Sequence, residues 1–386
     1  MPWVIDSDGP QITENRMRRP TRLKPVDRLR MRFYTFAMNK AAMMILRLML
    51  VGLALPAGVQ AQDYQVATHG NAITITKYIG AGGAVAIPEN IDGLPVTSIG
   101  MGAFLGSSLT SVTFPPSVIN IENGAFIDCS LASITLPSSI RTIGEQAFAG
   151  CANLSRVTIP NSIARIGGGA FSGCAHLQTV AIQSGVTSIG ESAFEGCTEL
   201  PGITIPNSVT NLEGAAFLDC TNLASITIPD SVISIGESAF SGCHRLSTIK
   251  IGTGVATIGD LAFQGCKNLP SISIPDHVTS LGKWGFAWCQ NLTSVKISSN
   301  VTNVGDYAFQ ECRSLASVTI PNRVNRIGIG AFSGCSNLTS LYFNGSAPRL
   351  EVDAFEGAGK ATIYHLPGTT GWGERFGGRP TAIWKQ

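Results

Sequence analysis

Ten cysteines have the widest chemical options in this sequence, because thiols can form disulfides, bind metal ions or act as nucleophiles. They recur every 22 or 23 residues, as Cys129, Cys151, Cys174, Cys197, Cys220, Cys243, Cys266, Cys289, Cys312 and Cys335. No Cys-x-x-Cys pair and no group of histidines accompanies them, which argues against a metal site. Equivalent positions in neighbouring repeats would lie ~4.8 Å apart, near enough for disulfides, but with parallel Cβ directions. The spacing favours buried free thiols, with occasional disulfides or a bound metal as the alternatives.

Residues that could act as catalytic acids or bases do not recur together. A catalytic histidine needs a positioned partner, yet the histidines fall at unrelated repeat positions: His69, His176, His244, His277 and His365. Glu191, Glu237 and Asp260 share one turn position. Solvated carboxylates at a corner explain this position better than an acid pair placed for hydrolysis. We therefore expect no enzyme, no catalytic residues, no metal ligands and no cofactor.

The elements that would position these residues are copies of one short sequence, clearest at 223–245. Each copy carries one phenylalanine, and the twelve are Phe104, Phe126, Phe148, Phe171, Phe194, Phe217, Phe240, Phe263, Phe286, Phe309, Phe332 and Phe355. Two intervals between them are 22 residues and nine are 23. A period this regular predicts a solenoid, in which each coil buries its apolar side against its neighbours.

One copy shows how a coil would form. Ile226 and Ile228 would point to one side of a strand, with Thr227 pointing out. Pro229 would end that strand, because proline cannot donate to a ladder. A second short extended piece would then lead to Gly236 at a corner, before Phe240 turns inward.

The run IPxSVxxIGxxAFxGCxNLxSI, as in 159–180 and 228–249, resembles the BspA-like leucine-rich repeat of bacterial surface and secreted proteins. The resemblance covers about residues 62–386, including 94–100 and 364–372. It implies a right-handed leucine-rich-repeat coil outside the cell, with adhesion or host-protein binding carried by few members and no catalytic residues. The chain departs from the pattern at Glu122, Glu213 and Glu351, which replace glycine, and in the first coil, which lacks its cysteine (Leu105-Gly106-Ser107).

The resulting fold class is a β-rich repeat solenoid of about twelve 22–23-residue repeats, with a cap at each end. Five segments are expected: a disordered or mis-started extension (1–37), a signal peptide (38–61), an N-terminal β cap (62–95), the leucine-rich repeat solenoid (96–357) and a C-terminal cap (358–386). The signal peptide is inferred from Lys40 and Arg47 before the apolar run 48–59 and a small-residue cleavage site. That run is shorter than the ~20 residues a membrane span needs, although an uncleaved anchor is the alternative.

The charge of the chain and its expected localisation limit the classes of partner that it can bind. Formal net charge is +2, but residues 1–61 hold ten Lys or Arg against four Asp or Glu, so the body beyond is near −4. A nucleic-acid partner would need a basic face. We expect a secreted or cell-surface monomer without a membrane span after signal cleavage, and an extracellular protein or glycan as its partner.

Breaks in the repeat pattern are the candidate binding residues. The outward strand position is usually Thr or Ser, but becomes Lys250, Lys296 and Tyr342 in the C-terminal half. Separately, one coil carries Lys283, Trp284 and Trp288. Aromatic side chains with nearby cations are typical interface anchors. The two groups are expected on different faces, and ordinary surface variation is the alternative explanation of both.

Three functions remain for a chain of this kind. The first is an extracellular module presenting its solenoid surface for binding or adhesion, and the second is a structural envelope component without a specific ligand. The third is a polysaccharide-acting β-helix enzyme, which needs converging acidic or basic side chains on neighbouring coils. Because outward strand positions are mostly threonine, the enzyme is the least favoured.

Overall fold

The computed structural model describes residues 63–384. The chain divides into two units, 1–57 and 58–386, and the described residues all belong to the second. The extension expected at 1–37 and the signal peptide expected at 38–61 lie outside the described residues, so both remain predictions. Between residues 63 and 384 all regular elements are β-strands, and no helix there could cross a membrane.

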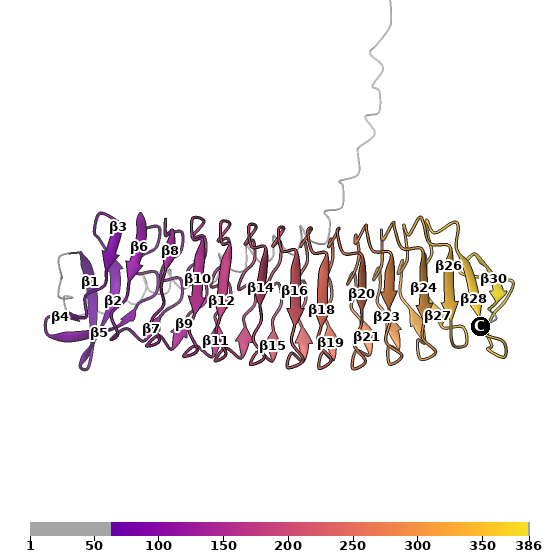
Figure 1. Ribbon diagram of the computed structural model, residues 1–386, viewed down its shortest axis with the longest axis horizontal. Helices are drawn as coiled ribbons and strands as arrows, with labels where there is room; N and C mark the ends of the chain where they lie inside the picture. The colour runs from indigo at the N-terminus through magenta and orange to yellow at the C-terminus, as the bar shows by residue number, and fades with distance from the viewer. Residues whose placement is uncertain (1–62, 385–386) are drawn as a thin grey trace, which may run out of the picture. The chain divides into compact units, whose positions relative to one another are not determined.

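Each coil contributes two strands, here called the first and the second strand, and the coils stack in chain order (Figure 1). The first strands are β3 (Gly83–Ala86), β6 (Leu109–Thr113), β8 (Ser133–Ile134), β10 (Arg156–Ile159), β12 (Thr179–Ile182), β14 (Gly202–Thr204), β16 (Ser225–Ile228), β18 (Thr248–Ile251), β20 (Ser271–Ser273), β22 (Ser294–Lys296), β24 (Ser317–Ile320), β26 (Ser340–Phe343), β28 (Thr362–His365) and β30 (Arg379–Ile383). The second strands are β2 (Ala72–Tyr78), β5 (Leu94–Ile99), β7 (Asn120–Ile121), β9 (Thr142–Ile143), β11 (Arg165–Ile166), β13 (Ser188–Ile189), β15 (Asn211–Leu212), β17 (Ser234–Ile235), β19 (Thr257–Ile258), β21 (Ser280–Leu281), β23 (Asn303–Val304), β25 (Arg326–Ile327) and β27 (Arg349–Leu350). The described residues therefore form a β-solenoid of about thirteen turns, which confirms the predicted fold class.

The coil at 223–245 has the structure expected from its sequence. In β16, Ile226 and Ile228 are buried and Thr227 between them is exposed. The strand ends directly before Pro229, where the N–H of Val232 bonds the Pro229 carbonyl at 3.1 Å to close a turn. Neighbouring coils pair in parallel and in register, so Thr227 lies opposite Lys250. A row of equivalent residues thus runs along the stack at ~4.8 Å per coil.

Proline also interrupts the ladder of first strands at two places. Where most coils have a residue that donates its N–H to the preceding coil, as Ala224 does to the Pro201 carbonyl at 2.9 Å, two coils have Pro201 and Pro270. Proline has no such donor. The hydrogen-bonded sheet breaks at both prolines, between β12 and β14 and between β18 and β20, although these strands stay in contact. It also breaks between β8 and β10 and between β22 and β24, where Ser155 and Ala316 occupy the equivalent position, so proline accounts for two of the four breaks.

The twelve repeat phenylalanines stack ring on ring through the centre. Neighbouring ring centroids lie 4.8 to 5.9 Å apart, with interplanar angles between 5° and 21°. Every ring is at most 2% exposed. Burying one such side chain stabilises the fold by about 1.5–3 kcal/mol, so the ladder as a whole contributes far more than any single polar contact.

All ten cysteines are buried and unpaired, which confirms the predicted stack of free thiols. Each Sγ lies 3.0 to 3.3 Å from the carbonyl oxygen of the phenylalanine in the preceding coil and donates to it. The thiol is thus a small apolar side chain that also supplies a weak donor between coils. That second role accounts for cysteine where alanine would fill less space and donate nothing.

We expect the native thiols to be inert toward disulfide reagents. Burial raises the pKa of Cys174, Cys289 and Cys335 to about 12, and the thiolate is the reactive form. Cys129 is set aside, because a hydrogen bond with Cys151 lowers its pKa. Colorimetric thiol titration at pH 8 should detect no fast-reacting cysteine from Cys151 to Cys335 in the folded protein and all ten in guanidinium chloride. Rapid reaction of several thiols without denaturant would contradict the buried stack.

Antiparallel pairings occur at both ends of the stack. β1 (Tyr64–His69) pairs with β2, and Tyr78 of β2 stacks on Phe104 at 5.0 Å. β4 (Asn90–Ile91) pairs with β5, which runs across the expected boundary at 95–96. At the other end β29 (Arg375–Phe376) pairs with β30, and the Phe376 ring lies 6.4 Å from that of Phe355. We propose that these segments close the stack as the expected caps.

Candidate functional site

One continuous row of side chains points outward from the first strands. We call it the outer row, and its members are Thr113, Thr135, Thr158, Ala181, Thr204, Thr227, Lys250, Ser273, Lys296, Thr319, Tyr342 and Tyr364. All are exposed except Tyr342 and Tyr364, which are half-buried. Strand register places them opposite one another, as in Thr227 with Lys250, Ser273 with Lys296, and Thr319 with Tyr342.

Three of the residues singled out by sequence fall in this row. Lys250 and Lys296 are exposed, two coils apart, and form no ion pair with any residue between 63 and 384. Asp230 is an acid on whose pKa the charge of Lys250 acts. Its pKa is lowered chiefly by hydrogen bonds from the Thr253 N–H and hydroxyl, and only then by Lys250. The two ammonium groups are therefore available to an external anion.

Tyr342, the third of these residues, belongs to an aromatic cluster. Its ring stacks on Tyr364 at 5.1 Å and contacts Trp384 at 4.9 Å with a 50° tilt. Asn344, two residues further along, has a buried side-chain oxygen, Oδ1, that accepts no hydrogen bond. Asn344 follows the last residue of β26, and because its Oδ1 is buried it is not open to a ligand. The C-terminal end of the outer row thus offers the aromatic rings as its contact surface.

The second strands carry a different surface, whose polar side chains bond one another from coil to coil. The Thr142 hydroxyl donates to Asn120 at 2.9 Å, and the Ser234 hydroxyl donates to Asn211 at 3.2 Å. Arg165 forms an ion pair with Glu213, two coils away. A face whose donors and acceptors already satisfy one another has little left to offer a ligand.

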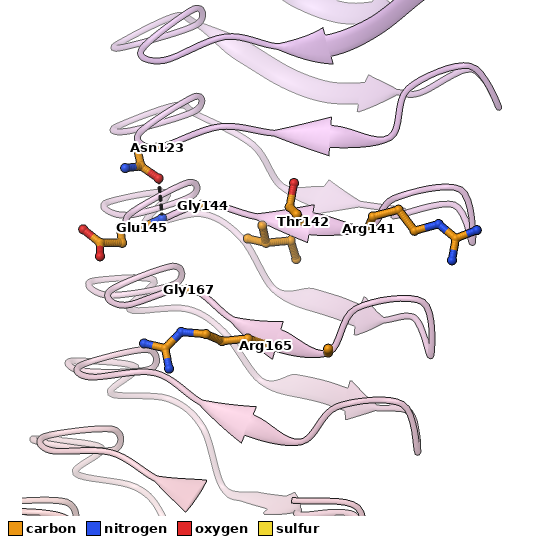
Figure 2. Close-up of a pocket in the computed structure, with 9 residues that line it drawn as sticks. Asn123, Arg141, Thr142, Gly144, Glu145, Arg165 and Gly167 are labelled. Carbon is orange, nitrogen blue, oxygen red and sulfur yellow. Dashed lines mark hydrogen bonds between the residues drawn. The ribbon is translucent and has the colours of Figure 1, made fainter.

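A shallow hollow of about 330 Å³ lies on this second-strand side, beside Thr142, Glu145 and Arg165 (Figure 2). The Asn123 side-chain oxygen accepts the Glu145 N–H at 2.9 Å. Arg141 and Arg165 extend in opposite directions in Figure 2, so the hollow gathers no converging charged groups. In the stretch from 63 to 384, no three His, Cys, Asp or Glu side chains group as metal ligands would.

The acidic turn residues form an exposed column of their own. Glu191, Glu237 and Asp260 are all exposed, and the Asp260 side chain accepts the Lys283 N–H at 2.7 Å. Partial burial raises the pKa of Glu237, and repulsion from Asp260 and Glu191 adds to the rise. These carboxylates are solvent-facing turn residues that repel one another mildly.

Lys283, Trp284 and Trp288 lie on the turn around Phe286, away from the first strands. The Trp284 ring stacks on Tyr307 of the next coil at 4.3 Å, and Lys283 Nζ lies 3.8 Å from an Asp306 carboxylate oxygen. Both tryptophans have left-handed backbones, with φ of 59° and 65°, at positions where many coils have glycine. The structure therefore brings Lys250, Lys296 and Tyr342 into one row and keeps Lys283, Trp284 and Trp288 apart from it.

Several partners of these residues are not among the binding residues expected from the sequence. Tyr364 and Trp384 lie in the segment expected as the C-terminal cap (358–386), and Tyr307 lies in the repeat that follows Trp284. A usable signal existed, since Tyr364 follows Tyr342 by 22 residues and Tyr307 follows Trp284 by 23. One repeat length separates stacked neighbours, so aromatic pairs at that interval predict ring contacts.

Comparison with known proteins places this architecture in context. The family described as "BspA type Leucine rich repeat region (6 copies)" matches residues 86–201, 169–279, 198–312 and 256–371. No curated protein sequence matches the chain. A leucine-rich cell surface protein of Faecalibacterium prausnitzii A2-165 is 28% identical, with a TM-score of 0.51, over 82% of this chain and 96% of its own.

Two further solved structures share the fold at lower identity. A leucine-rich repeat protein of Bacteroides ovatus is 23% identical, with a TM-score of 0.57, over 85% of this chain and 100% of its own. The pneumococcal vaccine antigen PcpA is 19% identical, with a TM-score of 0.55, over 85% of this chain and 98% of its own. These two likenesses concern the fold alone.

Proposed function

Because the chain belongs to the BspA-type leucine-rich repeat family, we propose that it is a non-catalytic, secreted or surface-exposed binding module whose outer row contacts an extracellular protein or glycan. The similar Faecalibacterium protein is named a cell surface protein, which supports this location. The predicted signal peptide at 38–61 supports export.

One observation carries the choice of the outer row. Its Thr and Ser side chains are exposed, and within 63–384 they form no side-chain bonds of the kind that join Thr142 to Asn120 on the second strands. Hydroxyl groups without internal partners can bond a ligand without first breaking a protein contact. The first-strand face is therefore the surface on which we expect the ligand to bind.

A steric block of this face tests the proposal. The purified protein is screened against immobilised extracellular proteins and glycans, and any ligand found is titrated against Thr227→Glu and Thr257→Glu. Thr227 lies in the outer row, whereas Thr257 is an equally exposed threonine on a second strand. We expect at least tenfold weaker binding for Thr227→Glu, unchanged binding for Thr257→Glu, and circular dichroism like the parent's for both.

Two results would count against the proposal. Equal binding by both variants and the parent would remove the outer row as the contact surface. Failure of the parent to bind any immobilised protein or glycan would favour the alternative, a structural envelope component without a specific ligand. Hydrolysis of a tested polysaccharide would instead revive the enzyme hypothesis.

A further inference from the structure

We propose that the part of the outer row from Lys250 to Tyr364 binds an acidic polysaccharide laid along the axis of the stack. This inference rests on the proposed binding function and names its ligand class. Lys250 and Lys296 would pair with the acidic groups of the sugar chain, and the cluster of Tyr342, Tyr364 and Trp384 would contact a sugar ring.

The first argument for this proposal is the charge of the first-strand face. None of the first strands between β3 and β30 contains Asp or Glu, whereas β10, β18 and β22 contribute Arg156, Lys250 and Lys296. The second strands contain no Asp or Glu either, but their arginines are neutralised by carboxylates beside them, as Arg165 is by Glu213. Within residues 63–384, Lys250 and Lys296 have no such ion pair, so the first-strand face offers cations that an external anion can bind.

The second argument is the spacing of the cations along the outer row. Lys250 and Lys296 occupy alternate coils with Ser273 between them, so at ~4.8 Å per coil their backbones lie about 10 Å apart. One coil advances by about the length of one sugar in an extended polysaccharide. Alternate coils therefore match a chain that carries one carboxylate or sulfate on every second sugar, with the Ser273 hydroxyl facing the sugar between.

The same spacing disfavours nucleic acid as the anion. A nucleic-acid strand carries a phosphate every ~3.4 Å, which calls for a much denser series of cations. Two lysines on alternate coils would neutralise only a minority of such phosphates. The sparse charge of the row fits a polymer with sparse charge.

The third argument is the aromatic cluster at the C-terminal end of the outer row. Tyrosine and tryptophan rings offer an apolar face for the C–H side of a sugar and a polar edge for its hydroxyls. The half-buried rings of Tyr342 and Tyr364 touch at 5.1 Å directly beyond Thr319. The Trp384 ring lies 4.9 Å from the Tyr342 ring with a 50° tilt, so a third aromatic side chain adds to this contact surface.

Titration with defined hexasaccharides tests the proposal on the full chain. The probes are a hyaluronan hexasaccharide, which carries one carboxylate on every second sugar, and a neutral chitin hexasaccharide of equal length. We expect the acidic probe to bind with an affinity that falls as salt rises, and the neutral probe to bind at least tenfold more weakly. The variant Lys250→Gln/Lys296→Gln should lose at least tenfold in affinity for the acidic probe and most of the salt dependence.

Matched variants separate the row from general charge and from folding. Lys267→Gln/Lys360→Gln removes the same charge from exposed positions outside the row and should bind within twofold of the parent. Tyr342→Ala should lose about tenfold in affinity, whereas Tyr342→Phe, which keeps the ring contacts, should bind like the parent. Equal losses in the two lysine double variants would overturn the proposal, as would equal binding of the two probes.

Failure here is distinguishable from failure of the proposed function. If neither hexasaccharide binds but a captured extracellular protein loses affinity on Thr227→Glu, the ligand class is wrong and the binding function stands. If neither a glycan nor a protein binds the parent, both are overturned.

Discussion

Replacement of Phe240 by alanine will lower the free energy of unfolding by about 3–5 kcal/mol. The Phe240 ring is fully buried, and it lies 5.5 Å from the Phe217 ring and 5.4 Å from the Phe263 ring. Alanine would leave a cavity in mid-stack that the neighbouring rings cannot fill, because each is held by its own coil. Urea denaturation followed by circular dichroism measures the loss.

Position in the ladder provides the control. Phe355 has one stacked neighbour, Phe332, at 5.9 Å, and on its other side only the tilted ring of Phe376 at 6.4 Å. In a solenoid each coil is stabilised by its nearest neighbours, so Phe355→Ala should destabilise the protein less than Phe240→Ala. Equal losses at both sites, or a loss below 1 kcal/mol at Phe240, would contradict a continuous ring stack that stabilises each coil through its neighbours.

Replacement of Gly236 by alanine will destabilise the protein by about 1–3 kcal/mol, although it adds a single methyl group. The backbone at Gly236 has no left-handed angle, so conformational freedom is not the reason for glycine here. An added Cβ would lie 2.5 Å from the Gly214 nitrogen and 2.5 Å from the Glu213 carbonyl carbon of the preceding coil. Because these are backbone atoms, the coils themselves would have to separate.

Gly168→Ala is the matched comparison and should have the opposite or no effect. An added Cβ there would lie 3.4 Å from the Glu191 carbonyl oxygen and 4.0 Å from Glu145 Cγ, both ordinary contacts, and the backbone angle is ordinary. Such a substitution restricts the unfolded chain and can stabilise by about 0.4–1 kcal/mol. Thermal melts of the two variants show whether each substitution raises or lowers the melting temperature. A similar fall in melting temperature for both variants would show that glycine is not required at Gly236 by its contact with the preceding coil.

Most of the fold could be predicted because every coil repeats one pattern of buried residues. Ile226, Ile228 and Phe240 recur at fixed intervals, and an interval fixes both the inward face and the residue that lies above it in the next coil. The same reasoning predicted unpaired thiols at Cys243 and its equivalents, since stacked side chains point in parallel. It did not predict the bond from each Sγ to a phenylalanine carbonyl, which depends on the offset between successive coils.

The candidate site could be predicted only in part. Lys250, Lys296 and Tyr342 were identifiable because they depart from threonine at one repeat position. Trp384 was not, because it follows the last strand, β30, outside the repeat, and its contact with Tyr342 depends on the path of the C-terminal residues. The Asn344 oxygen that accepts no hydrogen bond could not be predicted from the sequence either, because hydrogen bonding depends on surroundings that a repeat pattern does not specify.

Pro201 and Pro270 have a mechanical consequence. Tension along the axis is borne by the hydrogen bonds and side-chain contacts that join one coil to the next. At these two prolines the backbone donor is missing, and at Pro270 both sheets are interrupted, because β18 and β20 belong to different sheets and so do β19 and β21. A protein of this build, held at one end and pulled at the other, would therefore yield first near Pro270 and extend in blocks of several coils.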